Sequence, residues 1–199
     1  MLPARSDVTG PIATAERRDC QASPAHSARN YAKSDMDIRR ALESDFDAMW
    51  PVFQAVVATG DTYAFSPTTT RQDAFAYWFG AGMTSYVAVD GLRILGMYKL
   101  RANQRDLGSH VANASFMVDP ALQGTGTGTA LGHHCLREAQ NAGYKAMQFN
   151  FVVSTNRGAV SLWTKLGFSI VGTVPKAFKH HQLGYVDVYV MHRFLNRGS

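Results

Sequence analysis

The chain of 199 residues has the length of one ordinary domain, and its hydrophobic content of 46% is enough to bury a full core. It contains no run of 18 apolar residues, so we expect no membrane span. The net charge of +5 comes from lysines and arginines that are scattered along the chain, which argues against nucleic acid as a partner and suits an anionic small ligand.

The cysteines indicate the redox compartment of the protein, and the N-terminal composition indicates where the domain begins. Cys20 and Cys135 form neither a disulfide framework nor a metal-binding spacing, which indicates a reducing, cytoplasmic setting. Residues 1–35 are rich in Ala, Ser, Pro, Arg and Asp, and they lack the apolar stretch of a secretory signal. Such a segment cannot bury enough surface to offset its ordering entropy. We therefore expect a flexible extension at 1–35 and a domain at 36–199.

The hydrophobic periodicity predicts seven strands and four helices in the domain. Pro51 inside the first helical pattern implies either an early-turn position or a kink. The pair Asp90-Gly91 is a hairpin signal between two strands. The expected strands are 36–41, 84–89, 93–101, 110–118, 145–153, 168–173 and 184–191, and the expected helices are 46–59, 71–79, 128–141 and 156–166.

The order of these elements is β-α-α-β-β-β-α-β-α-β-β. Alternation of strand and helix in the second half implies a parallel crossover, whereas the first half supplies hairpins. The economical arrangement is an α/β (α+β) fold with a mixed, largely antiparallel sheet of about seven strands and helices on both faces.

A glycine-rich stretch, Gln123 to Ala130, lies between an apolar strand pattern and the start of a helical one. A strand, a glycine turn and a helix N-terminus in this order form an anion site, because free N–H groups of the first helical turn bind phosphate oxygens. A Walker A loop would require a lysine, but Thr129 follows Gly128. A dinucleotide loop would require an acid about 20 residues further on, and the strand at 147–153 contains none. We infer another phosphate-bearing ligand.

The pattern Gln123-x-x-Gly126-x-Gly128 resembles the acyl-CoA pyrophosphate loop of the GNAT N-acetyltransferase superfamily. Residues 156–168 resemble the second CoA motif of that family, in which an Asn opens a helix and the motif closes on Gly-Phe. The resemblance covers about residues 36–194. It implies acetyl transfer from acetyl-CoA to an amine by direct attack, in a sheet whose fourth and fifth strands splay apart.

Several short segments are similar to the fungal azetidine-2-carboxylate (proline-analogue) acetyltransferases, whose members acetylate small amines of amino-acid type. This resemblance implies a small-molecule amine as acceptor, either an amino acid or an analogue. The segments that carry it are 60–63, 77–79, 110–113, 149–156 and 162–163.

The family resemblance also implies a set of cofactor-binding residues. The pantetheine arm would pair with the backbone of the fourth strand, and a backbone N–H near Met117 would polarise the acetyl carbonyl. The glycine loop would take the pyrophosphate. The expected cofactor-binding residues are Phe116, Met117, Val118, Gln123, Gly124, Thr125, Gly126, Thr127, Gly128, Thr129, Asn156, Ala159 and Trp163.

Three asparagines are the expected catalytic residues. A carboxamide at Asn150, in an apolar strand, is costly if buried unpaired, so it is either a satisfied core residue or a side chain that faces the splay. Asn113 is a similar case across the same gap. Asn156 caps a helix and, by resemblance, also contacts pantetheine or substrate. Tyr63 and Phe65, in a loop, are expected to line the acceptor pocket together with Asn113 and Asn150.

The sequence departs from the family pattern where protons must move. The usual general acid is a tyrosine at the position of Trp163, and an indole cannot serve as an acid. Tyr63, Tyr98 and Ser154 are the alternative candidates for protonating the thiolate. The fourth strand has no carboxylate to act as a base, so we expect a water-mediated proton path or an amine that arrives neutral.

Alternatives to acetyl transfer to a small amine are also compatible with the sequence. We expect no metal, since adjacent histidines such as His133-His134 point to different sides of their element without acidic partners. A non-catalytic acyl-CoA-binding module and an acetyltransferase for protein N-termini both stay open. The aromatic loop 63–65 favours a closed pocket over a peptide groove. A homodimer through the C-terminal strands is compatible with the sequence.

Overall fold

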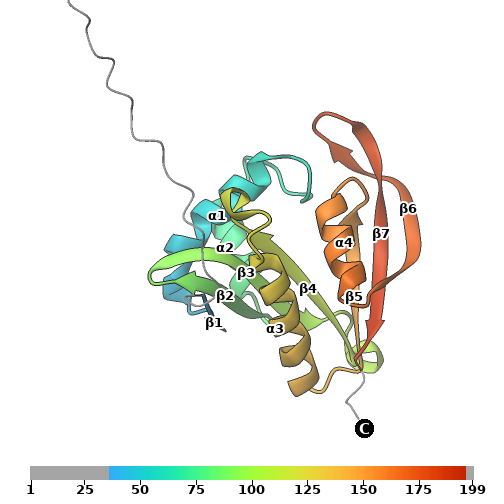
Figure 1. Ribbon diagram of the computed structural model, residues 1–199, viewed down its shortest axis with the longest axis horizontal. Coiled ribbons are helices and arrows are strands. Elements are labelled where there is room, and N and C mark those ends of the chain that lie inside the picture. The colour runs from blue at the N-terminus through green and yellow to red at the C-terminus, as the bar shows by residue number, and fades with distance from the viewer. Residues whose placement is uncertain (1–35, 196–199) are drawn as a thin grey trace, which may run out of the picture. The chain divides into compact units, whose positions relative to one another are not determined.

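The computed structural model describes residues 36–195, which form a mixed α/β domain (Figure 1). The predicted extension at 1–35 lies outside these described residues. The elements are β1 (Asp37–Arg40), η1 (Glu43–Asp45), α1 (Phe46–Ala58), α2 (Arg71–Phe79), β2 (Thr84–Asp90), β3 (Arg93–Ala102), η2 (Asp106–Gly108), β4 (Val111–Val118), η3 (Pro120–Leu122), α3 (Thr127–Asn141), β5 (Ala146–Val153), α4 (Arg157–Lys165), β6 (Ser169–His180) and β7 (Gly184–Phe194).

The seven strands form one sheet in the order β1-β2-β3-β4-β5-β7-β6. Neighbouring strands are antiparallel except for β4 and β5, which are parallel. These two strands pair only where Val111 faces Ala146 and Ala112 faces Met147, and beyond that point they separate (Figure 1). The fold class, with its mixed sheet and its divergent central strands, is therefore confirmed.

The two larger hydrophobic cores of the described residues lie on opposite faces of the sheet, because alternate residues of a strand point to opposite sides. Val87 and Met97 belong to the core under α1 and α2, whereas Ala88 and Tyr98 belong to the core under α3. Trp78 of α2 is fully buried in the first of these cores. Among residues 36–195, every helix is too short or too polar to cross a bilayer.

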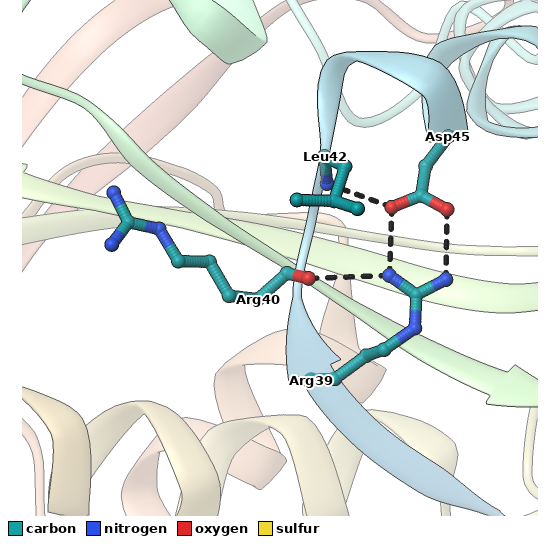
Figure 2. Close-up of polar contacts among 4 residues, drawn as sticks. All are labelled: Arg39, Arg40, Leu42 and Asp45. Carbon is teal, nitrogen blue, oxygen red and sulfur yellow. Dashed lines mark hydrogen bonds and ion pairs between the residues drawn. The ribbon is translucent and has the colours of Figure 1, made fainter.

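The first strand is fastened to the first helix by one carboxylate (Figure 2). The Arg39 guanidinium donates two hydrogen bonds of 2.7 Å to Asp45, and the backbone N–H of Leu42 donates a third, also 2.7 Å. The Arg39 hydrogen bond is the main cause that lowers the pKa of Asp45 below its usual value. This arrangement fixes the turn between β1 and α1, and so the helix that covers the first core.

The structure differs from the prediction at the β2–β3 turn and at the ends of β6 and β7. Helix α1 agrees with the predicted helix at 46–59 and continues through Pro51, which lies in its second turn on an exposed face. The two-residue loop of the β2–β3 hairpin is Gly91-Leu92, one residue later than expected, because Asp90 pairs with Arg93. Strand β6 extends to His180, whereas the sequence indicated an end near residue 173.

Candidate active site

The glycine loop before α3 has the backbone geometry of an anion site. Gly124 and Gly126 have φ of +81° and +93°, in the left-handed region that side chains disfavour. A Cβ at either position would meet no atom within 4 Å, so the loop is open on this side. The first hydrogen bond of α3 runs from the Ala130 N–H to the Gly126 carbonyl at 3.0 Å. The N–H groups of residues 127–129 precede it and have no intrahelical acceptor.

The loop and the start of α4 form the two walls of a groove of about 630 Å³. Arg157 and Lys165, both exposed on α4, give the groove positive charge that suits phosphate. Thr125 and Thr127 do not line it, and their hydroxyls lie 3.1 Å apart and support the loop from behind. The predicted cofactor residues that line the groove are Val118, Gln123, Gly124, Gly126, Gly128, Thr129, Asn156 and Ala159.

A second cavity, of about 400 Å³, lies where β4 and β5 have separated. The loop between α1 and α2 contributes Tyr63 and Phe65, as expected for an acceptor pocket. Thr62, Asn156 and Ala159 line both this cavity and the groove, so the two spaces meet. Asn156 also caps α4, because its Oδ1 accepts the Ala159 N–H at 3.0 Å. The other predicted residues that line the second cavity are Asn113, Phe116, Asn150 and Trp163.

Four carboxamides connect the splayed strands. Asn103, which follows β3, accepts hydrogen bonds through Oδ1 from Asn113 of β4 at 3.1 Å and from Asn150 of β5 at 2.7 Å. Gln148 donates to the Asn150 Oδ1 at 2.8 Å. Asn150 is exposed at an irregularity in the pairing of β5 with β7, and bulges of this kind re-aim a side chain. Asn150 is therefore not a core residue, and it faces the splay together with Asn113.

Comparison with known proteins decides the family. Residues 41–168 match the model of the acetyltransferase (GNAT) family. The chain belongs to this family.

Relatives and solved structures agree with this assignment. The GCN5-related N-acetyltransferase from Kribbella flavida is 41% identical, with a TM-score of 0.78 over 82% of this chain and 99% of that one. The N-acetyltransferase aca1 of Schizosaccharomyces pombe is 28% identical over 67% of this chain and 72% of that protein. A phosphinothricin acetyltransferase from Sinorhizobium meliloti, solved with acetyl-CoA, is 19% identical and has a TM-score of 0.72 over 83% of this chain and 91% of that one.

The family assignment confirms that the protein is an acetyl-CoA-dependent N-acetyltransferase, as the sequence predicted. The residues present in this chain fit the donor. The open left-handed glycines, the free helix N-terminus and the two α4 cations are complementary to its phosphates.

Trp163 is the residue that the family resemblance places where a tyrosine is expected as the general acid. Its indole is buried, and its ring centroid lies 4.7 Å from those of both Phe116 and Phe149. The side chain is thus part of the aromatic floor of the cavity.

Met117, whose backbone was expected to polarise the acetyl carbonyl, buries its side chain in the core under α1 and α2.

Of the three proposed proton donors, only Tyr63 lines the acceptor cavity. Its hydroxyl donates to the backbone carbonyl of Phe116 at 2.5 Å. Burial raises the pKa of Tyr63 well above its usual value, so the phenol stays protonated at neutral pH. Tyr98 is buried beneath α3, where its hydroxyl lies 2.7 Å from Nδ1 of His134. Ser154 lines neither the groove nor the cavity.

Sequence reasoning missed the polar residues that β3 and the segment after it bring to this site. Asn103 lies in a stretch that reads as the start of a polar connection, yet it joins two strands. Lys99 and Arg101 alternate on β3 and pair in register with Ser115 and Asn113 of β4. A period-2 search for polar residues on β3, aligned with those on β4, is the signal that would have found them.

Proposed function

We propose that the protein transfers the acetyl group of acetyl-CoA to the amine of a small molecule, with an amino acid or an analogue as the acceptor. The observation that carries this proposal is the meeting of two spaces at the splayed strands. A phosphate-binding groove opens into a cavity with aromatic and carboxamide walls, and Asn156 lies at the junction. The enclosing loop with Tyr63 and Phe65 supports a compact acceptor over an extended peptide.

Different residues of this chain bind the donor, polarise its acetyl carbonyl and orient the amine. In this proposal the loop from Gln123 to Thr129 binds the pyrophosphate, and the backbone of residues 116–118 holds the pantetheine arm. The bound donor supplies an acetyl group already activated as a thioester. A backbone N–H near Met117 polarises the acetyl carbonyl. Asn113 and Asn150 orient the amine through neutral hydrogen bonds, and their own positions are fixed by Asn103.

Proton movement follows from what the cavity contains. No Asp or Glu lines the acceptor cavity among the described residues, so we infer that the amine arrives neutral or loses its proton through water. Tyr63 is our candidate for returning a proton to the departing thiolate, because its phenol is protonated and lies in the wall of the cavity.

Some finer assignments belong to the same proposal. We also propose that the protein belongs to the azetidine-2-carboxylate acetyltransferase subgroup, because of the similar segments given above. A cytoplasmic location and a homodimer are part of the same proposal. The non-catalytic acyl-CoA-binding module that the sequence left open does not agree with the family assignment, so a group other than the buried Trp163 must protonate the thiolate.

The test is release of free thiol from acetyl-CoA in the presence of an amine panel that includes azetidine-2-carboxylate and proline analogues. We expect Asn150→Ala to lower kcat by about tenfold or more, with the Kd for acetyl-CoA changed less than about twofold, because the lost hydrogen bond lies in the acceptor cavity. Asn141→Ala, at the exposed end of α3, is the matched control. Tight acetyl-CoA binding without turnover of any amine in the panel would contradict a small-amine acceptor.

A further inference from the structure

A smaller cavity of about 250 Å³ adjoins the acceptor cavity on the side of β3. Lys99, Arg101 and Asn103 line it from β3 and the segment after it. Asn113 and Asn150 line both this cavity and the acceptor cavity, so they form a shared wall. The proposed function assigns no role to the two cations.

Lys99 is buried, and its ammonium group has N–H donors beyond the one that the Tyr77 carbonyl accepts. The residue is 5% exposed, and its Nζ donates to the backbone carbonyl of Tyr77 at 2.8 Å while lying 3.0 Å from the centroid of that ring. An ammonium group has three N–H donors, and the carbonyl takes one of them. Arg101 places a second positive charge in the same small space and uses Nε for the neighbouring Ala102 carbonyl at 3.1 Å.

The cavity lacks negative charge to match these cations. Within residues 36–195, the ion pairs join Arg39 to Asp45, Arg71 to Asp47, and Arg93 to Asp119, and none reaches Lys99 or Arg101. A buried charge without a counter-charge is costly.

The missing counter-charge affects the protonation of Lys99. Its neighbours are Tyr77 of α2, Ser115 of β4 and Arg101 of its own strand. Burial, followed by repulsion from Arg101, lowers the pKa of Lys99 to about 7. An anion in the cavity would restore the favourable charge balance.

We infer that this cavity is a carboxylate subsite, so that the acceptor of the proposed reaction is an amine that carries a carboxylate close to its nitrogen. This inference rests on the proposed function and assigns the residues that bind the carboxylate of its acceptor. Lys99 and Arg101 supply charged donors, and Asn113 and Asn150 separate them from the acceptor cavity. A carboxylate held by the two cations therefore leaves a nearby amine beside the carboxamides that face the donor.

The experiment compares acid and amide forms of one amine, namely azetidine-2-carboxylate with azetidine-2-carboxamide and alanine with alaninamide. The unmodified protein should prefer the acids by about tenfold or more in kcat/KM, because charge-assisted hydrogen bonds are lost in the amides. Arg101→Gln should reduce this preference by about tenfold, mainly through the acceptor KM, with the KM for acetyl-CoA unchanged. Arg40→Gln, on exposed β1, is the control and should leave the preference intact.

Calorimetric titration of the same acids and amides into the CoA-loaded protein tests the subsite without turnover. Tighter binding of the acids, weakened by Arg101→Gln and by Lys99→Gln, supports the subsite even if no acetyl transfer occurs, and in that case the proposed function fails alone. Equal binding of acid and amide, or absence of binding by both, overturns the subsite. Equal loss of acid and amide turnover in Arg101→Gln also overturns it, whereas the proposed function stands.

Discussion

At the scale of single residues, the Tyr63 hydroxyl links the acceptor loop to the strand expected to hold the donor. It donates to the carbonyl of Phe116 at 2.5 Å, and burial keeps the phenol protonated by raising its pKa. If Tyr63 protonates the thiolate, Tyr63→Phe should lower kcat by about 100-fold, the usual scale of general acid catalysis, and leave the Kd for acetyl-CoA within about twofold. Steady-state thiol release would measure kcat, and stopped-flow binding of acetyl-CoA would measure the Kd.

Tyr144→Phe is the control for this substitution. Tyr144 is half-buried and borders neither the groove nor the acceptor cavity. Its loss of a hydroxyl should leave kcat unchanged. If Tyr63→Phe retains full kcat, the thiolate must receive its proton from solvent, and the hydroxyl has only a positioning role.

The residue scale also shows where sequence reasoning stopped. Asn113, Asn150 and Asn156 were predicted as site residues, and the structure brings all three to one cavity. Asn103 was not predicted, because it follows a strand and nothing in its local pattern distinguishes it from a loop residue. Its importance arises from contacts 10 and 47 residues away along the chain, which only the folded sheet creates.

At the scale of elements, the turn into α3 depends on one backbone conformation. Gly126, the N-cap of α3, has φ of +93°, so Gly126→Ala should destabilise the fold by about 1–2 kcal/mol and weaken acetyl-CoA binding. Gly128 is already inside the helix, and a Cβ there would lie at an ordinary 3.5 Å from Leu162. Gly128→Ala should therefore keep the stability, as urea unfolding would show. Equal losses in both variants would contradict a conformational cause.

The elements themselves were largely predictable from periodicity. Apart from the end of β6, the seven strands and four helices occur where the hydrophobic pattern placed them, within a few residues. The second half of β6 was missed, because Pro175 and exposed polar residues interrupt its pattern. As the outermost strand, β6 tolerates a proline that lacks a backbone N–H, and its pairing with β7 resumes at Phe178 after an irregularity.

At the scale of the whole domain, the site exists because β4 and β5 pair at only two positions. The parallel crossover could be predicted from the alternation of strand and helix, but the divergence came from family resemblance. Hydrophobic spacing encodes which face of a strand is buried and carries no information about how far two strands stay together. The cavities, and the cations that β3 brings to one of them, therefore required the structure.

The buried Lys99 should make the stability of the whole domain depend on pH. Its pKa is about 7 in the folded protein and 10.5 as the reference value for the unfolded chain, so the unfolded state binds more protons between these values. The free energy of unfolding should therefore rise from pH 7 to pH 9, and Lys99→Met should flatten this rise. Cys135, whose pKa burial raises, works in the opposite direction only from about pH 9 upward, which sets the upper limit of the window. Urea unfolding at several pH values would measure the slope, with exposed Lys179→Met as the control. A slope that survives in Lys99→Met would mean that this lysine keeps its charge in the folded protein, held by an anion or by water within the small cavity.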